Sequence, residues 1–112
     1  MSKPADFVQG TLDVLVLKIL ALEPQHGWAI SQRLKQISGD VLRVSEGSLY
    51  PTLYKLEHEG WITAEWKATA ETNRRAKFYS LTRAGRKQLA LQTADWDRLS
   101  AAVSLVLRHE GA

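Results

Sequence analysis

The sequence predicts a mainly α-helical fold with one small β-hairpin, followed by a long helix at the carboxyl end. Apolar residues recur with helical spacing in three segments before residue 60, alternate with other residues between 62 and 81, and then repeat every seven residues. The length of 112 residues fits one compact unit. Within it we expect a first part over residues 1–81 and a helical extension over residues 82–112.

The first predicted helix covers residues 11–22 and is apolar on almost every side. Thr11 is the expected N-cap, and Pro24 ends the helix because proline disfavours helical backbone in the residue before it. A helix that is apolar nearly all round is buried on more than one side. In so short a chain we expect a partner subunit to cover part of it, at Leu12 and Leu15.

The second predicted helix, residues 27–38, has a stripe of Ile30, Leu34 and Ile37 that we expect to be buried. Gly39 then follows at the position where helices favour glycine. Trp28 is expected to be half-buried on this helix.

The third predicted helix, residues 45–59, begins at Ser45 as N-cap. Its inner face carries Leu49, Leu53 and Leu56. Pro51 stands inside it, where a proline costs about 3 kcal/mol. Either the regular helix begins near Tyr50, or its start is locally bent. Local rules tend to fail at functional sites, so this proline points weakly to function.

The apolar period then changes to two. Ile62, Ala64 and Trp66 alternate with polar residues, residues 68–75 read as a polar turn, and Lys77, Tyr79 and Leu81 alternate in a second strand. A lone hairpin is marginally stable in water, so it must pack on the helices. We expect Trp61 and Trp66 to take part in that packing.

Thr82 is the expected N-cap of a fourth helix that runs to about Arg108. Such a helix spans about 39 Å, whereas a domain of this size has a radius of gyration of only about 13 Å. It should therefore protrude and bury its seam against a second copy of the chain. The apolar residues of that seam are Leu89, Trp96, Leu99, Val103 and Val106.

The positive charge is concentrated in one stretch. The formal net charge is only +3, but residues 67–87 hold seven basic residues and the single acid Glu71, whereas residues 1–60 hold six bases and seven acids. A localised basic stretch is typical of nucleic-acid binding. An ordinary solvated face would have the same composition, so charge alone leaves both interpretations open.

Several classes of function are disfavoured. The chain has no cysteine, and His26, His58 and His109 have no metal-ligand spacing, so we expect no metal and no cofactor. No catalytic motif is recognisable, and we expect no enzyme activity. The longest apolar segment is too short to span a bilayer and no signal peptide is visible, so we expect a cytoplasmic protein without membrane contact.

Three helices followed by a basic hairpin is the winged helix-turn-helix arrangement. The third helix is the candidate reader, because the major groove of B-DNA is about 12 Å wide and admits one helix. The hairpin can reach phosphates, and the start of the second helix can offer backbone N–H groups. The predicted DNA-binding residues are His26, Gly27, Ser48, Tyr50, Pro51, Thr52, Tyr54, Lys55, Arg74, Arg75, Lys77 and Tyr79.

At these residues the sequence resembles the PadR family of bacterial regulators. The reader helix has Gly47-Ser48-Leu49-Tyr50-Pro51-Thr52-Leu53 for the family's Gly-x-Leu-Tyr-Pro-x-Leu. The hairpin has Arg74-Arg75-Ala76-Lys77-Phe78-Tyr79-Ser80-Leu81-Thr82, with Ala76 inserted into the family's Arg-Arg-Lys-Tyr-Tyr-x-Leu-Thr. Trp28 replaces a frequent tyrosine. The resemblance covers residues 10–107.

The resemblance implies a homodimer, formed through the last helix with help from the first, on a palindromic promoter site. It also implies a repressor, released by a small aromatic compound, of a nearby operon such as one for an efflux transporter. Trp96 would stack on that compound or only pack in the dimer seam. The alternative function is a winged helix that contacts proteins and does not bind DNA.

Overall fold

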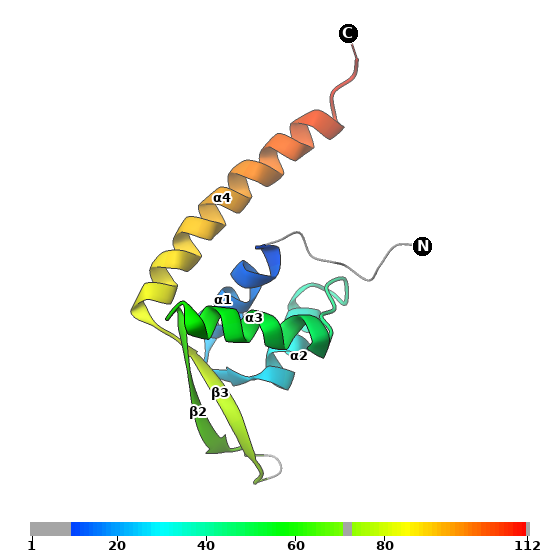
Figure 1. Ribbon diagram of the computed structural model, residues 1–112. Coiled ribbons are helices and arrows are strands. Elements are labelled where there is room, and N and C mark those ends of the chain that lie inside the picture. The colour runs from blue at the N-terminus through cyan, green and yellow to red at the C-terminus, as the bar shows by residue number, and fades with distance from the viewer. Residues whose placement is uncertain (1–9, 71–72, 112) are drawn as a thin grey trace.

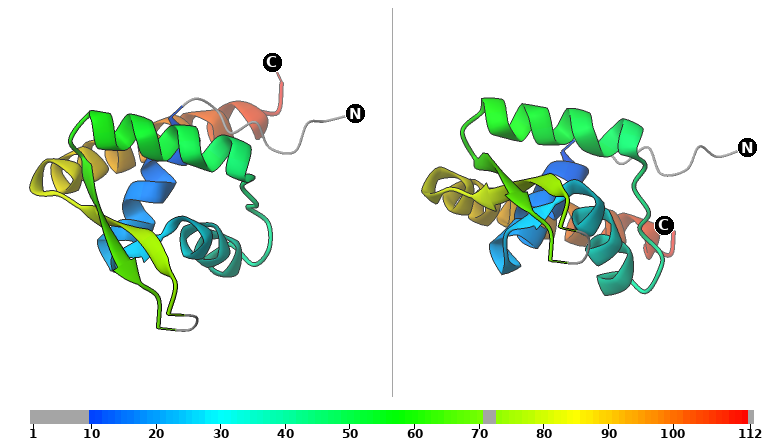
Figure 2. Two further views of the ribbon diagram at one scale, coloured as in Figure 1. Left: turned by 60° about the horizontal axis from the view of Figure 1, so that its bottom comes forward. Right: turned by 90° about the horizontal axis from the view of Figure 1, so that it is seen from below.

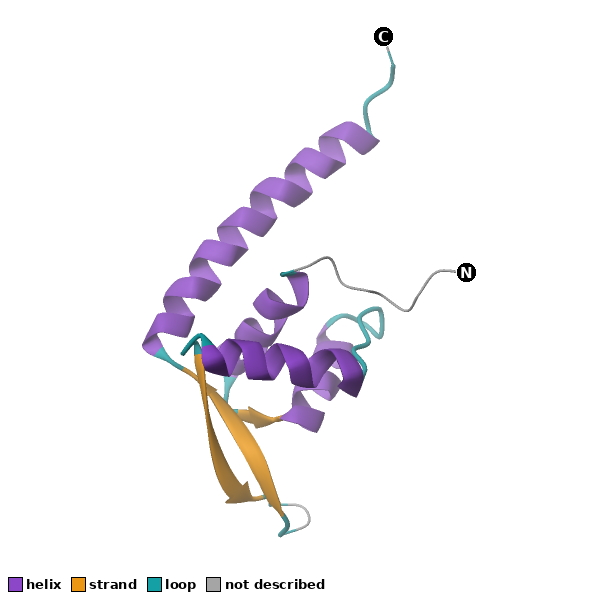
Figure 3. Ribbon diagram, viewed as in Figure 1, coloured by secondary structure: helices purple, strands orange, loops and turns teal. Residues whose placement is uncertain are grey.

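The computed structural model describes residues 10–70 and 73–111. In that part the chain forms four helices and one small antiparallel sheet, so the predicted fold class is confirmed (Figure 1, Figure 3). Residues 1–9 and 71–72, including Glu71 of the predicted turn, lie outside the described residues. The elements are α1 (Thr11–Leu22), β1 (Gln25–His26), α2 (Gly27–Ile37), α3 (Glu46–His58), β2 (Ile62–Ala68), β3 (Arg75–Leu81) and α4 (Arg83–Leu107).

One apolar core joins the first three helices to the sheet. The helices contribute the residues that helical spacing predicts, and the sheet adds one residue from each strand of the hairpin. The core residues are Leu12, Val16, Leu17, Ile19, Leu20, Ile30, Leu34, Leu49, Leu53, Leu56, Ile62 and Tyr79. A hairpin on its own is only marginally stable in water. This one is stabilised by packing on the helices, as predicted.

The helix starts agree with the predictions at two sites and differ at a third. The side chains of Ser45 and Thr82 accept hydrogen bonds from the backbone N–H groups of Ser48 and Gly85, so both predicted caps are confirmed. Thr11 is not a cap, because α1 already includes it. Gly10 stands before it with a φ of 91°, a backbone conformation that favours glycine.

Pro51 lies within a helix that begins at Glu46. The interpretation in which the regular helix begins near Tyr50 is therefore wrong. Figure 1 shows α3 as one continuous helix from its first turn to its last.

The sheet has a third strand that the sequence did not indicate. The short strand β1 pairs with β3, which gives the strand order β1-β3-β2. Two residues are too few to produce a period-two pattern, and so β1 escaped prediction. The two longer strands also extend further than expected, to Ala68 and from Arg75, which shortens the turn between them.

Three large apolar residues are more exposed than expected. Trp28 is 64% exposed, Trp66 is 58% exposed and Ile37 is 56% exposed. Trp66 therefore does not pack within the hairpin as predicted, and Trp28 is not half-buried. Ile37 is the last residue of α2, where the core no longer covers the helix. The expectation for Trp61 is confirmed, because it packs against the core from the turn before β2.

A partly buried ion pair ties α3 to α1. The Lys55 ammonium lies 2.5 Å from a carboxylate oxygen of Asp13, whose residue is only 7% exposed. A buried carboxylate without a partner is costly, whereas an exposed ion pair contributes only about 0–1 kcal/mol. Because Asp13 is buried, removing Lys55 would cost more than removing a cation from an exposed pair such as Arg98–Asp95.

The start of α4 is docked closely on the turn before β2. Thr82 donates hydrogen bonds to the carbonyls of Gly60 and Trp61, from its hydroxyl and its N–H. Gly85 is buried there, against the Trp61 carbonyl and the Leu81 side chain. From this point α4 leaves the core and the hairpin leaves it in the other direction (Figure 1). The molecule is elongated, at 62 × 33 × 20 Å with a radius of gyration of 15.9 Å.

Adding a methyl group at Gly85 should weaken the junction of α4 with the domain. The new Cβ would overlap the Trp61 carbonyl and lie 2.7 Å from Leu81 Cδ1, so backbone must move. We expect Gly85→Ala to lower the free energy of unfolding by about 1–3 kcal/mol, measured by thermal or urea denaturation.

Gly47→Ala is the matched control. Gly47 also lies in a helix, but its Cβ would meet only Ser45 Oγ at 3.8 Å. Alanine should there raise stability by about 0.5–1 kcal/mol. Equal stabilities of Gly85→Ala and Gly47→Ala would contradict the close docking of α4.

Candidate nucleic-acid interface

The side of α3 opposite the core carries polar groups close to the helix start. Ser48, Pro51 and Tyr54 are exposed, whereas Thr52 is half-buried. The Thr52 hydroxyl donates to the carbonyl of Ser48 at 3.0 Å, which leaves its oxygen able to accept. The Ser48 hydroxyl lies 3.3 Å from that of Ser45. This face offers hydrogen-bonding groups next to the exposed ring of Tyr54.

Pro51 changes the backbone of this face. Proline has no N–H, so the carbonyl of Gly47, four residues earlier, receives no helix hydrogen bond from it. Gly47 is itself exposed. The proline that violates the helix rule therefore leaves this carbonyl without its usual helix donor.

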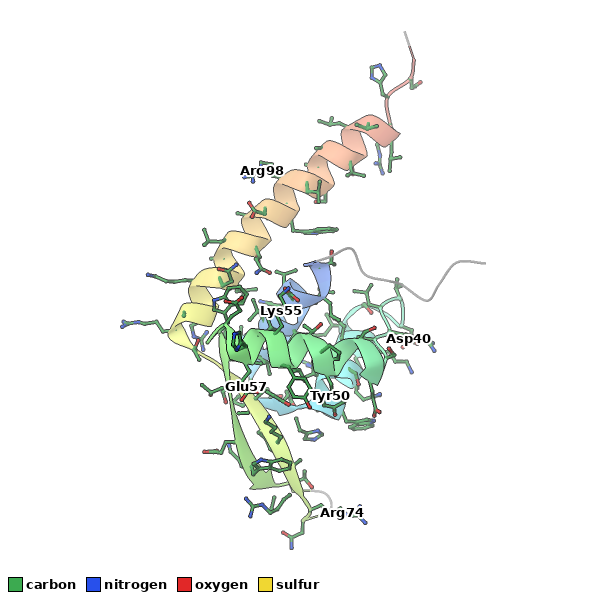
Figure 4. The ribbon with its side chains drawn as sticks, in the orientation of Figure 1. Asp40, Tyr50, Lys55, Glu57, Arg74 and Arg98 are labelled. Atoms are coloured by element: carbon green, nitrogen blue, oxygen red, sulfur yellow. The ribbon has the colours of Figure 1, made fainter. Side chains whose placement is uncertain are left out.

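Lys55 does not join these groups. It was predicted to contact DNA, but its ammonium is engaged by Asp13 of α1. Figure 4 shows Lys55 on the side of α3 that faces α1 and Tyr50 on the side that faces the hairpin. We therefore assign Lys55 to the support of α3.

The backbone N–H groups at the start of α2 are less accessible than the sequence predicts. His26 Nδ1 accepts a hydrogen bond from the Ala29 N–H at 3.3 Å, so the side chain itself caps the helix. Gly27 is buried, because the ring of Tyr50 lies over it. A Cβ at Gly27 would come within 2.6 Å of the Tyr50 hydroxyl oxygen. Tyr50 thus packs α3 against α2, and Gly27 is not a surface group.

The hairpin carries its cations on two levels. Along its length, Lys77 lies 3.4 Å from a Glu57 carboxylate oxygen and 5.8 Å from the ring centre of Tyr54, so it joins the hairpin to α3. Toward the tip, Arg74 and Arg75 are exposed, and Figure 4 shows Arg74 at the far end. The turn is closed by a hydrogen bond from the Thr69 N–H to the Arg74 carbonyl. The exposed positive charge therefore lies at the tip.

Tyr79 belongs to the core and not to the outer surface. It is 2% exposed, which corrects the expectation of a DNA contact. Burial, with a smaller contribution from the Glu57 carboxylate, raises the pKa of the Tyr79 hydroxyl to about 12. The hydroxyl therefore stays protonated at neutral pH.

An open groove of about 440 Å³ runs between α3, the start of α2 and the hairpin. It brings together half of the predicted DNA-binding residues, from three segments that lie far apart in the sequence. These are His26, Gly27, Tyr50, Tyr54, Lys77 and Tyr79. Ser48, Pro51 and Thr52 lie on α3 outside its lining, and the two arginines lie farther along the hairpin.

Sequence reasoning missed three residues of the groove, Trp28, Trp66 and Ala76. The alternation in β2 does place Trp66 on the same face as the core residue Ile62. The point at which the helices cease to cover that face could not be read from the sequence.

The predicted interface residues divide into two groups. Leu12 is buried in the core of its own chain, which corrects its assignment to a surface between subunits, and Leu15 and Leu89 are partly buried against that core. The exposed remainder lies on α4: Trp96, Leu99, Val103 and Val106. A cavity of about 220 Å³ lies where Trp96, Leu99 and Gln92 of α4 face Thr11 and Val14.

Neither a bilayer-spanning helix nor a metal-binding cluster occurs in the described part of the chain. Across residues 10–70 and 73–111 no helix is both long and apolar enough to cross a bilayer. In the same part of the chain, no three His, Asp or Glu side chains gather so that they could hold a metal ion.

Comparison with known proteins gives a consistent result. A PadR-like transcriptional regulator from Bacillus cereus is 30% identical, with a TM-score of 0.76 over 91% of this chain and 96% of the other. A PadR-like transcription factor from Bacteroides fragilis is 31% identical, with a TM-score of 0.69 over 87% of this chain and 90% of the other. An uncharacterized protein X of Lysinibacillus sphaericus is 23% identical over 92% of this chain and 94% of its own length.

The sequence profile of the transcriptional regulator PadR-like family matches residues 16–91, which include α2, α3, the hairpin and the beginning of α4. The fold and the reader-helix and hairpin motifs agree with that match. The chain belongs to the PadR-like family of transcriptional regulators.

Proposed function

We propose that this regulator is a homodimer that binds a palindromic site in double-stranded DNA through α3 and the hairpin, and that it represses a nearby operon. The observation that carries the proposal is the division of the molecule into two ends. The hairpin and the carboxyl-terminal half of α4 leave the helical core in different directions (Figure 2). The exposed arginines belong to the hairpin, and the exposed apolar stripe belongs to α4. Two copies joined along α4 would therefore keep both binding faces open.

Binding to phosphates should make the affinity fall steeply with salt, because counterions are released. With the duplex from the protein's own promoter, we expect a linear fall of log K with log salt in a fluorescence anisotropy titration. Arg75→Ala should weaken binding and make the slope shallower by about one unit for each arginine removed.

Arg98→Ala is the control, since it removes the same charge from the middle of α4. It should leave both the affinity and the slope unchanged. If the protein binds no duplex at low salt, not even the duplex from its own promoter, the proposal of DNA binding is refuted. The alternative function, a winged helix that contacts proteins, would then replace it.

The dimer rests on the exposed stripe of α4. Val103 is 46% exposed and Val106 is 75% exposed, in a helix whose residues from 101 onward are all exposed. Such a stripe at seven-residue spacing is typical of a helix that packs on another helix.

In sedimentation at micromolar concentration, we expect the wild-type protein to have twice the mass of the chain. Val103→Glu should shift it to the monomer, because it buries a charge in the seam. Ala101→Glu introduces the same charge on the opposite side of α4 and should leave the dimer intact. A wild-type monomer would refute the proposal.

A small planar aromatic effector is the further part of the proposal. The cavity beside Trp96 supports it, as does the buried Gln92 Oε1, which has no hydrogen-bond partner within the described residues. The volume of about 220 Å³ is below the roughly 300–1,000 Å³ of typical ligand sites, so we propose that the second subunit completes the site.

Binding of such a compound should quench tryptophan fluorescence and lower the affinity for the promoter duplex. Trp96→Ala should remove most of the quenching. An absence of quenching across a panel of flat aromatic compounds, or quenching that persists unchanged in Trp96→Ala, would argue against the effector.

A further inference from the structure

Three exposed aromatic side chains surround the groove between α3 and the hairpin. Trp28 of α2, Tyr54 of α3 and Trp66 of β2 are 64%, 62% and 58% exposed, and all three line the groove. Single exposed aromatics are common on protein surfaces and need no explanation. Three around one groove form a surface that is suited to binding.

The strand register explains how Trp66 reaches this position. Side chains alternate along a strand, so the cross-strand pairs Ile62–Leu81, Ala64–Tyr79, Trp66–Lys77 and Ala68–Arg75 share one face of the hairpin. The pair at the base of the hairpin, Ile62–Leu81, lies in or against the core. The pair nearest the tip, Ala68–Arg75, carries an exposed arginine. Trp66 stands between them, on the continuation of the core face beyond the cover of the helices.

The charges around the groove restrict what can occupy it. Lys77 lies between the hairpin and α3, where the Glu57 carboxylate partly neutralises it at 3.4 Å. The groove wall is therefore mainly aromatic, and the exposed positive charge lies beyond it at Arg75. An occupant must present apolar faces to the aromatic rings and negative charge toward the hairpin tip.

The sugar–phosphate backbone of DNA has this pattern. Each deoxyribose presents a C–H face that can pack on an aromatic ring, and each phosphate presents oxygens that can accept from an indole N–H. The groove lies between the proposed reader helix and the hairpin, so a duplex bound to both would lie across it.

We propose that Trp66 and Trp28 hold the deoxyribose backbone of one DNA strand in this groove, between the reader helix and the hairpin. This inference rests on the proposed DNA binding. It adds two residues that contribute apolar contacts to the affinity for DNA. These contacts do not depend on the base sequence of the DNA. The arginines then supply the salt-dependent part of the affinity, and the tryptophans supply a part that is insensitive to salt.

The test measures duplex affinity at several salt concentrations for Trp66→Ala and Trp28→Ala. Each should weaken binding to the promoter duplex and to an unrelated duplex by the same factor, about fivefold, which is the lower end of the range for aromatic contacts with nucleic acids. The slope of log K against log salt should not change, because no charge is removed. Thermal unfolding should be nearly unaffected, since both side chains are exposed.

Thr63→Ala is the matched control on the same strand. Thr63 is exposed, and alternation places it on the face of the hairpin opposite Trp66. It should bind both duplexes as the wild type does. Trp66→Phe keeps an apolar ring and should retain most of the affinity that Trp66→Ala loses.

The outcomes separate this inference from the proposed function. If both alanine variants bind duplexes like the wild type while Arg75→Ala binds weakly, the groove inference is overturned and DNA binding stands. If the wild type binds no duplex, both fail. If the alanine variants keep their duplex affinity but lose fluorescence quenching by a planar aromatic compound, the groove is a small-molecule site and the backbone contact is refuted.

Discussion

The packing of Ile62 and Tyr79 into the core formed by α1, α2 and α3 is the contact on which the binding face depends. Each fully buried side chain of this size contributes about 1.5–3 kcal/mol, whereas the partly exposed Lys77–Glu57 pair contributes about 1 kcal/mol or less. Apolar packing therefore sets the position of the hairpin. That position in turn brings Lys77 close to Glu57. Once that face is fixed, alternation obliges Trp66 and Arg75 to lie on the same side as α3.

A second constraint determines where the rest of the molecule can go. Gly85 allows the first turn of α4 to lie against the Trp61 carbonyl, so α4 leaves the core on the side away from the hairpin. The apolar stripe of α4 is then remote from the polar start of α3. Because both constraints act at the base of the hairpin, one small sheet positions the proposed DNA contacts and the proposed dimer helix together.

Much of this could be predicted from the sequence, and the exceptions have physical reasons. Periodicity identified all four helices and both long strands, and the caps at Ser45 and Thr82 have the expected geometry. What failed depended on contacts between distant residues. Lys55 has a partner 42 residues away, Gly27 is covered by a ring from α3, and Tyr79 continues the core. A local pattern carries no information about such partners.

Hydroxyl-radical footprinting of the protein on its own promoter tests the central claim most directly. A dimer that places two copies of α3 in the major groove should protect two segments related by a dyad, with centres about one helical turn, or 10–10.5 base pairs, or a multiple of it apart. The backbone between reader helix and hairpin should be protected in each half-site. A single unsymmetrical protected segment, or none at a saturating protein concentration, would contradict the account.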